Sequence, residues 1–366
     1  GRARIMTKLK KVRILMFGPD LNAKSGISNV VNNWLEAGFE KMVKLDYVPT
    51  LKSFVPGKYF AKTVEALNAY FGLIKRTFKT VDIVHIHFAD GMSFYRKFLI
   101  FVYTKFFGLK TVIHMHVPDV TRFYEGAPNF KKKLVKLFFN KSDAIFVLSE
   151  SWKEFCKKIS NNPRIYIVYN GASINKFSGK IDNKEKIVIS LMGRLGKRKG
   201  VYDLLEAFNK LRSDVPEAHL FLGGDGDITG VKDIIKEKKL ENQIHILGWV
   251  TGEQKIQVFK QSDIYVLPSY HEGLPVSIVE AMAAGAPIIS TPIGGIPEAV
   301  IENRNGFLIK PGDVDALCSR LRLLLRDKNL RERMGRESLL IIQEKFDIEK
   351  ITNKLVDLYN EILEET

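Results

Sequence analysis

The sequence predicts an α/β protein of two domains, each built on a parallel sheet with helices on both faces. The chain has 366 residues, enough for about two domains of ordinary size. Hydrophobic residues make up 45% of it, which is enough to form two sizeable cores. Short β-branched or aromatic segments alternate with longer segments of helical periodicity, and this alternation is typical of repeated βαβ units.

The first half of the chain contains the first series of alternating elements. Continuous apolar character predicts strands at Val12–Phe17, Met42–Val48, Ile83–His87, Thr111–Met115, Ala144–Leu148 and Ile165–Val168. Apolar residues at helical spacing predict helices at Ile27–Phe39, Ala61–Phe78, Ser93–Phe107, Asn129–Asn140 and Ser151–Ile159.

The same alternation restarts after Gly171. Strands are expected at Ile187–Met192, Leu220–Gly223, Ile244–Leu247, Ile264–Leu267, Ile288–Ser290 and Phe307–Ile309. Helices are expected at Tyr202–Leu211, Val231–Lys238, Glu253–Lys260, Val276–Ala284, Ile296–Ile301 and Val314–Leu325. The sequence therefore predicts two Rossmann-like units in series.

The boundary between the domains is expected at Asn170 to Lys186, where glycines, a serine and an Asp-Asn pair interrupt the apolar periodicity. We expect this segment to be a hinge between domains of residues 1–172 and 173–345. Two helices follow the last strand, at Asn329–Lys345 and Ile348–Leu363. The final segment, residues 346–366, could pack back on the first domain.

The positive charge of the chain is concentrated in its first half. Residues 1–175 hold 29 Lys and Arg against 12 Asp and Glu, whereas residues 176–366 hold 28 against 29. Such asymmetry suggests that the first domain faces something anionic, either nucleic acid or an acidic membrane surface. A basic surface that serves only solubility is the alternative. Because no nucleic-acid-binding motif is recognisable, the membrane surface is the favoured partner.

Several other classes of protein are not favoured. The two cysteines, Cys156 and Cys318, are too far apart in sequence to suggest a disulfide framework or a zinc module. The longest apolar run, Phe98 to Phe107, is short for a membrane span and contains Lys105. No secretory signal is recognisable, so a cytoplasmic location is expected, with peripheral attachment to the inner face of the cell membrane as an option.

Ligands of doubly wound sheets bind beyond the carboxyl ends of the strands, so the loops there are the first candidates for function. The loop after the first strand contains Gly26 at the start of a helix, which suits either an anion site or a plain turn. His85 with His87, and His114 with His116, form pairs on two strands. A metal site is not favoured because such strands are buried on both faces, and His116, at its strand's end, is the best functional candidate.

Two loops of the second half carry stronger signals. In Gly193–Gly200, Arg194 and Lys199 at a strand-to-helix turn could clamp a diphosphate, or the loop could be an ordinary basic surface. In Ser269–Glu280, Pro275 suits the first position of a helix, and the backbone amides of Gly273 to Val276 could bind phosphate.

Two further acidic features of the second half need an interpretation. Glu280 falls inside an apolar helix and needs exposure or partners, for which sugar hydroxyls are suitable. Asp225-Gly226-Asp227 matches a two-aspartate pattern that can hold a metal ion, but its glycine-rich surroundings favour a turn.

The segment Glu272 to Glu280 resembles the Glu-x7-Glu element of the retaining nucleotide-sugar glycosyltransferases of family four, which have the GT-B fold. Other elements follow in that family's order: Ser25-Gly26, His116, Tyr169-Asn170-Gly171, Gly193-Arg194-Leu195, Lys199-Gly200, Gly223-Gly224-Asp225-Gly226, Gly248, Gly294-Gly295-Ile296-Pro297-Glu298 and Asn305-Gly306-Phe307-Leu308. The resemblance covers nearly the whole chain and is densest over residues 186–312.

This resemblance implies a fold, a reaction and a set of site residues. Two Rossmann-like β/α/β domains would face each other across a cleft, the first binding the acceptor and the second a nucleotide-diphosphate sugar, with a UDP-sugar favoured. His116, Arg194, Lys199 and Glu272 would be the catalytic residues, with Arg194 and Lys199 replacing a metal at the departing diphosphate. Donor-binding residues would be Gly26, Gly193, Arg194, Lys199, Leu247, Gly273, Leu274, Pro275 and Glu280, with Glu280 on the ribose hydroxyls.

The expected product is a glycan or a lipid-linked sugar of cell-surface polysaccharide or glycolipid synthesis, made without metal or other cofactor. Ser25-Gly26, where the family commonly has two glycines, and Val117-Pro118-Asp119 after His116 depart from the family's pattern. They leave the acceptor open. Two alternatives also stay open: an epimerase or hydrolase of nucleotide sugars with the same fold, and a catalytically silent module that binds sugar nucleotides or membranes.

Overall fold

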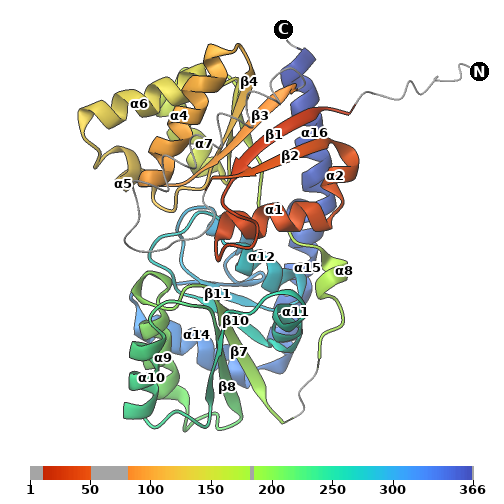
Figure 1. The fold of residues 1–366 in the computed structure, drawn as a ribbon. Coiled ribbons are helices and arrows are strands. Elements are labelled where there is room, and N and C mark those ends of the chain that lie inside the picture. The colour runs from red at the N-terminus through yellow and green to blue at the C-terminus, as the bar shows by residue number, and fades with distance from the viewer. Residues whose placement is uncertain (1–10, 51–80, 182–184, 365–366) are drawn as a thin grey trace, which may run out of the picture. The chain divides into compact units, whose positions relative to one another are not determined.

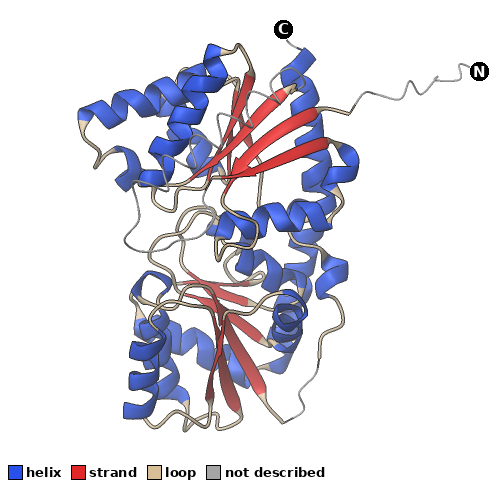
Figure 2. Cartoon of the chain, viewed as in Figure 1, coloured by secondary structure: helices blue, strands red, loops and turns tan. Residues whose placement is uncertain are grey.

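The computed structural model of the chain describes residues 11–50, 81–181 and 185–364 (Figure 1). They form two compact units. The first unit contains the chain up to Val147, then Lys153–Val168 and the segment from Lys350 onward. The second unit contains Leu148–Trp152 and Tyr169–Glu349. Each unit is a six-stranded sheet flanked by helices (Figure 2), which confirms the predicted α/β fold of two domains.

The sheet of the first unit has the strand order β2-β1-β3-β4-β5-β6, and all its neighbouring strands are parallel. Its strands are β1 (Arg13–Gly18), β2 (Lys44–Pro49), β3 (Ile83–Phe88), β4 (Lys110–Met115), β5 (Ala144–Val147) and β6 (Ile165–Ile167). The helices lying wholly or mainly in this unit are α1 (Gly26–Glu36), α2 (Phe39–Met42), α4 (Met92–Phe106), α5 (Val120–Tyr124), α6 (Asn129–Lys141), α7 (Glu150–Ile159) and α16 (Ile348–Glu364).

The central strand β3 divides the core of the first unit into two parts. All six of its residues are buried, and its side chains alternate between the two faces of the sheet. Phe88 points to the face where Phe94 of α4 and Phe138 of α6 pack. His85 and His87 point to the other face, where the ring of Trp34 from α1 lies 6.1 and 5.5 Å from theirs. One face is thus an aromatic core and the other holds buried imidazoles.

The sheet of the second unit has the order β12-β11-β10-β7-β8-β9, again with parallel neighbours. Its strands are β7 (Ile187–Met192), β8 (Ala218–Gly223), β9 (Ile244–Gly248), β10 (Ile264–Leu267), β11 (Ile288–Ser290) and β12 (Gly306–Leu308). Its helices are α8 (Ile174–Phe177), η2 (Lys197–Lys199), α9 (Val201–Leu211), α10 (Ile228–Glu237), α11 (Gly252–Gln261), α12 (Val276–Ala283), α13 (Ile296–Ala299), α14 (Val314–Arg326), α15 (Lys328–Ile341) and η3 (Ile342–Phe346).

The structure corrects the expected elements at a few places. The helix expected at Ile27–Phe39 ends at Glu36 because Gly38, at φ +83°, breaks it, and α2 then takes Met42 from the expected strand. The expected hinge contains the short helix α8, capped by Ser173. The helix expected at Asn329–Lys345 is α-helical up to Ile341, as α15, and continues as the short π-helix η3. The helix expected at Ala61–Phe78 lies outside the described residues.

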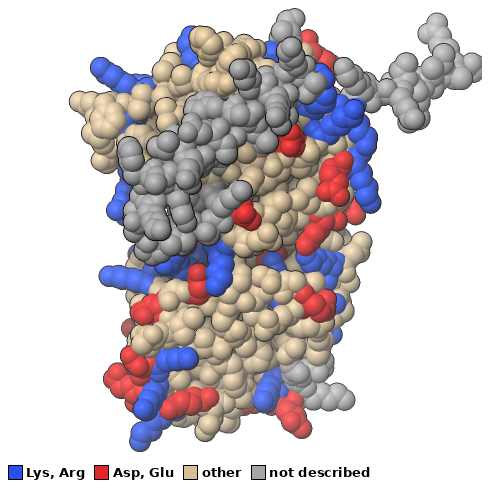
Figure 3. All heavy atoms as spheres, viewed as in Figure 1, with Lys and Arg blue, Asp and Glu red and all other residues tan. Residues whose placement is uncertain are grey.

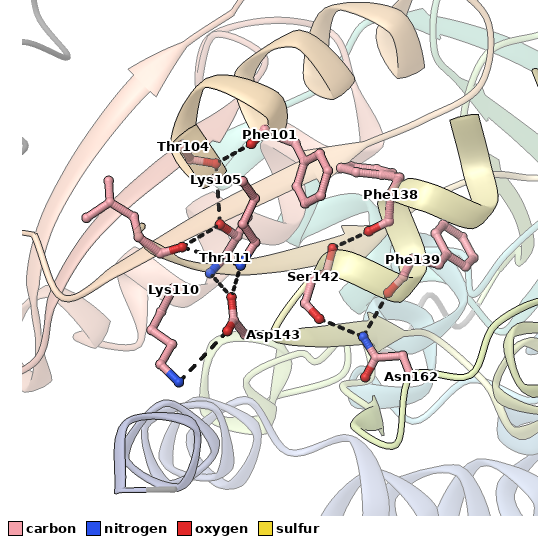
Figure 4. Close-up of polar contacts among 11 residues, drawn as sticks. Phe101, Thr104, Lys105, Lys110, Thr111, Phe138, Phe139, Ser142, Asp143 and Asn162 are labelled. Atoms are coloured by element: carbon pink, nitrogen blue, oxygen red, sulfur yellow. Dashed lines mark hydrogen bonds and ion pairs between the residues drawn. The ribbon is translucent and has the colours of Figure 1, made fainter. Parts of the chain in front are cut away.

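A close-up of the first unit shows how the ends of α4 and α6 are held against the sheet (Figure 4). The Asp143 carboxylate accepts hydrogen bonds from the Thr111 backbone amide at 2.7 Å and from Lys105 Nζ, and it pairs with Lys110 Nζ at 3.8 Å. Ser142 Oγ donates to the Phe138 carbonyl at 2.5 Å. Lys105, near the end of α4, and Lys110, at the start of β4, are therefore already paired with a carboxylate.

Candidate active site

The loop between β10 and α12 carries the strongest sequence motif, and it lies at the carboxyl end of the second sheet. Pro275 occupies the N-cap of α12, one position before the place predicted for it, and no side chain caps this helix. The first amides of α12 thus keep their preference for an anion.

A carboxylate and three donors meet in this loop. The Glu272 carboxylate is 2.5 Å from Lys199 Nζ and 3.0 Å from Arg198 NH1, and Ser269 Oγ donates to it at 3.3 Å. Glu272 and Lys199 are both buried, with relative exposures of 8% each. Burial lowers the pKa of Lys199, and Glu272 opposes this effect. The structure therefore brings two predicted site residues, Lys199 and Glu272, together.

Arg198 was not among the predicted site residues. It lies in η2, where its guanidinium contacts both the Glu272 carboxylate and the His271 carbonyl, each at 3.0 Å. The run Lys197-Arg198-Lys199 showed that cations gather here, but only the 3-10 turn decides which of them point toward Glu272. Arg194, the predicted one, is exposed on the preceding loop and makes no hydrogen bond or ion pair with another described residue. Its guanidinium is available for an anion.

Two glycine turns support the cationic loop. Gly193 has φ +147°, and a Cβ there would come within 3.1 Å of Lys199 Cε. Gly224, at φ +152°, lies so close to Gly193 that a Cβ on Gly224 would be 1.8 Å from the Gly193 carbonyl oxygen. The Leu195 amide donates to the Asp225 carbonyl at 2.6 Å. The turns after β7 and β8 therefore pack backbone to backbone, which requires glycine.

The Asp225-Gly226-Asp227 segment has a local structural role. Asp227 is the N-cap of α10 and accepts the Gly230 amide at 3.0 Å. The Tyr202 hydroxyl donates a hydrogen bond to the same carboxylate. The hydrogen bond from Tyr202, and to a smaller extent the one from the Gly230 amide, lower the pKa of Asp227. Asp227 thus caps a helix, as its setting in a glycine-rich turn favoured.

Glu280 is buried in α12 with 2% of its surface exposed. Its carboxylate pairs with Lys255 Nζ of α11 at 2.6 Å, so the partner that a buried carboxylate needs is a lysine. Sequence reasoning missed Lys255, since no motif surrounds it. Leu247, one of the expected donor-binding residues, is half-buried near the end of β9.

The backbone of the loop that holds Glu272 packs against the segment around Gly294. A Cβ at Gly294 would be 2.1 Å from the Glu272 carbonyl oxygen, and the Gly295 amide donates to the Gly273 carbonyl at 2.7 Å. Gly273 itself lies against Trp152, whose ring a Cβ would approach to 2.7 Å. Asn170 Nδ2 donates to the Leu274 carbonyl at 2.5 Å. Backbone contacts rather than side chains set the position of this loop.

Gly26 and His116 belong to the first unit, whereas the other predicted site residues belong to the second. Gly26 begins α1, where Ser25 Oγ caps the helix by accepting the Ser28 amide at 3.1 Å. A Cβ on Gly26 would meet no atom within 4 Å. His116 is half-buried just after β4, and its Nε2 is 2.9 Å from His87 Nδ1. Burial lowers the pKa of His116 to about 3, so its imidazole is neutral at physiological pH.

The buried histidines lie close together. One ring nitrogen from each of His85, His87 and His114 lies within 4.8 Å of the others. The rings of His85 and His87 are stacked with an interplanar angle of 16°, and those of His87 and His114 with 27°. Because imidazole lone pairs lie in the ring planes, rings stacked this way do not direct their lone pairs at one point. This geometry does not favour a metal site.

Comparisons with known proteins agree with this arrangement. Residues 172–339 match the family "Glycosyl transferases group 1" and residues 35–176 match "Glycosyltransferase Family 4". An uncharacterised glycosyltransferase of Methanocaldococcus jannaschii is 30% identical over 268 residues, which are 68% of each chain. The UDP-Gal:alpha-D-GlcNAc-diphosphoundecaprenol alpha-1,3-galactosyltransferase of Escherichia coli is 28% identical over 342 residues, 87% of this chain and 84% of its own.

A solved structure supports the same assignment at the level of the fold. The sucrose-phosphate synthase of Thermosynechococcus elongatus superposes with a TM-score of 0.80 at 19% identity, over 97% of this chain and 100% of its own. The resemblance seen in Glu272–Glu280 is therefore confirmed along the chain. The chain belongs to glycosyltransferase family 4 and is a glycosyltransferase of the GT-B fold.

Proposed function

We propose that this glycosyltransferase moves a sugar from a UDP-sugar to a glycan or lipid-linked acceptor, with retention of configuration, in polysaccharide or glycolipid synthesis. The observation that carries the proposal is the cluster of Lys199, Arg198 and Glu272 beside the uncapped start of α12. The name of the Escherichia coli relative supplies the class of donor and acceptor, a UDP-sugar and a lipid diphosphate.

The charges of Arg194, on the loop before η2, and of the cluster suit a departing diphosphate. Arg194 can give the leaving group two parallel hydrogen bonds, and Lys199 a point charge. Glu272 holds Lys199 in place until the donor arrives, and the negative diphosphate then favours the ammonium form that burial disfavours. Glu280, fixed by Lys255, accepts from the ribose hydroxyls, and the backbone of Gly273 and Leu274 binds the sugar and its phosphate.

Donor turnover measured with and without acceptor tests the proposal. Radiolabelled UDP-sugars would be incubated with membrane lipid extracts or oligosaccharides, and both released UDP and labelled product would be followed. Acceptor-dependent UDP release with a product of retained anomeric configuration is expected. Equal UDP release without acceptor would indicate a hydrolase, and a new sugar epimer on intact UDP would indicate an epimerase. Binding of the donor without turnover would indicate a silent module.

Transfer is expected not to depend on a divalent metal. Arg194 and Lys199 would supply the positive charge at the diphosphate, and the Asp227 carboxylate is already engaged by Tyr202 and Gly230. The transfer rate should therefore be the same in EDTA as in buffer with added magnesium. Loss of activity in EDTA and recovery with Mn²⁺ would contradict this expectation.

The first unit has a surface suited to an anionic membrane. Seven of the eleven large apolar side chains exposed in the described residues lie on or next to α4 and α6: Met92, Leu99, Val102, Phe106, Phe107, Phe130 and Leu137. On α4 the first four are spaced along one face of the helix, and Phe106 is 83% exposed. Lys133 and Lys136 are exposed on α6, and Figure 3 shows basic side chains on both sides of an uncharged surface there.

These features support peripheral attachment through α4 and α6, at the inner face of the cell membrane. Exposed aromatic and aliphatic side chains enter the lipid interface, while each nearby lysine adds about 1 kcal/mol on anionic lipid. Within the described residues, no helix has both the length and the apolar character needed to cross a bilayer. Lys105, Lys110 and Lys131 contribute less, since they already pair with Asp143 and Asp90.

Vesicle sedimentation tests this attachment. The protein should pellet with vesicles of anionic lipid but not with neutral ones, and less in high salt. Replacing Lys133 and Lys136 with glutamate, or Phe106 with serine, should release it. The matched control is Lys232→Glu with Lys236→Glu on α10, which changes the net charge equally on the second unit. Equal release by the control pair, or no pelleting with anionic vesicles, would contradict the proposal.

A further inference from the structure

The hydrogen bond between His87 and His116 links a fully buried histidine to the half-buried one at the end of β4. His87 lies in β3 and His116 follows β4, so the two strands that carry them are neighbours in the sheet. The bond joins His87 Nδ1 to His116 Nε2 at 2.9 Å. Whichever nitrogen donates decides where each ring carries its proton.

Both imidazoles are neutral, so the bond holds one proton. Burial lowers the pKa of His87 well below its ordinary value, with the neighbouring histidines adding to the effect, and lowers that of His116 to about 3. A neutral imidazole has one N–H and one lone pair. Two arrangements remain: His87 donates from Nδ1, or His116 donates from Nε2.

The surroundings of His87 Nε2 distinguish these arrangements. This atom is buried and has no hydrogen-bond partner among the described residues. If His116 donated, His87 would carry its proton on Nε2, as an unpaired buried N–H. If His87 donates, Nε2 has only an unpaired lone pair. Orphaned buried N–H groups are rarer in proteins than under-satisfied acceptors, so the second arrangement is the more stable.

We propose that His87 is a positioning residue that donates from Nδ1 to His116 Nε2 and thereby keeps the proton of His116 on Nδ1. His116 then offers a hydrogen-bond donor, not a general base, to a ligand that reaches its Nδ1. If that ligand is the transferred sugar, His116 donates to an oxygen of the sugar. This last step rests on the proposed function, whereas the position of the protons does not.

Nitrogen NMR of the protein labelled with ¹⁵N-histidine reads the protons directly and needs no substrate. The chain has seven histidines, so single substitutions can assign the signals. We expect His116 to show a protonated Nδ1 and an unprotonated Nε2, and His87 a protonated Nδ1. A protonated Nε2 on His116 would overturn the proposal, even if no transfer activity were found.

Kinetics of His87 variants test the effect on transfer. Asparagine can place an N–H group near the position of Nδ1, so His87→Asn should keep kcat close to wild type, whereas His87→Leu should lower it about tenfold with little change in the donor KM. His85→Leu is the control, because His85 lies on the same face of β3, is equally buried and hydrogen-bonds Tyr359 instead.

The outcomes separate a positioning role from a structural one. Retained kcat in His87→Asn and His85→Leu, with a fall only in His87→Leu, supports the proposal. Equal falls in His85→Leu and His87→Leu would show that loss of packing is the cause and would overturn it. If wild type transfers no sugar, the proposed function fails and the NMR result alone decides the tautomer.

Discussion

Replacing Arg194 with alanine should lower kcat for sugar transfer by roughly 100- to 1,000-fold, which corresponds to about 2.7–4 kcal/mol of transition-state stabilisation. Arg194 is exposed and pairs with no described residue, so the variant should fold as wild type does. Lys199→Ala should show a similar loss of kcat together with reduced stability, because it leaves the buried Glu272 with Arg198 as its one remaining cation among the described residues.

Lys197→Ala is the matched control for this prediction. Lys197 lies in the same 3-10 turn but is exposed and makes no ion pair with a described residue. Its removal tests whether the positive charge of the loop alone speeds the reaction. Steady-state kinetics of the three variants, measured with a donor that the wild-type enzyme turns over, would test this prediction. Wild-type kcat in Arg194→Ala, or an equal loss in Lys197→Ala, would remove Arg194 from the proposed clamp.

Replacing Gly224 with alanine should destabilise the second unit by about 3 kcal/mol or more. The new Cβ would lie 1.8 Å from the Gly193 carbonyl oxygen, in a backbone conformation with φ +152° that side chains rarely adopt. Because the turns after β7 and β8 pack backbone to backbone, the strain cannot be relieved by moving a side chain. Thermal or urea unfolding of the variant measures this loss.

Gly26→Ala provides the contrast. A Cβ at Gly26 would meet no atom within 4 Å, and this residue stands in the first turn of α1. Its stability should match wild type or exceed it slightly, since alanine favours a helix more than glycine does. If both alanine variants unfolded alike, the contacts of Gly224 would not be the cause.

Sequence patterns located most of the elements because the buried strands are continuous apolar segments. The strand predicted at Ile264–Leu267 has the same bounds in the structure. Short helices such as α2 and α8 were missed because four residues cannot show a helical period. At the site, Lys199 and Glu272 could be named from motifs. Their partner Arg198 depends on a local turn, and Lys255 reaches Glu280 only through the tertiary fold.

The first unit is formed by segments that lie far apart in the chain, and this has a consequence for how the protein folds during synthesis. Tyr359 of α16 is fully buried against His85 and Phe146, and Leu355 and Ile362 are buried with it. Helix α16, which is synthesised after the strands of both sheets, therefore completes the core of the first unit. A fragment that stops after the first six strands would lack α16 and would expose to water the side chains that α16 covers, such as Phe146. Any exchange of this unit between related enzymes has to carry α16 together with the first six strands.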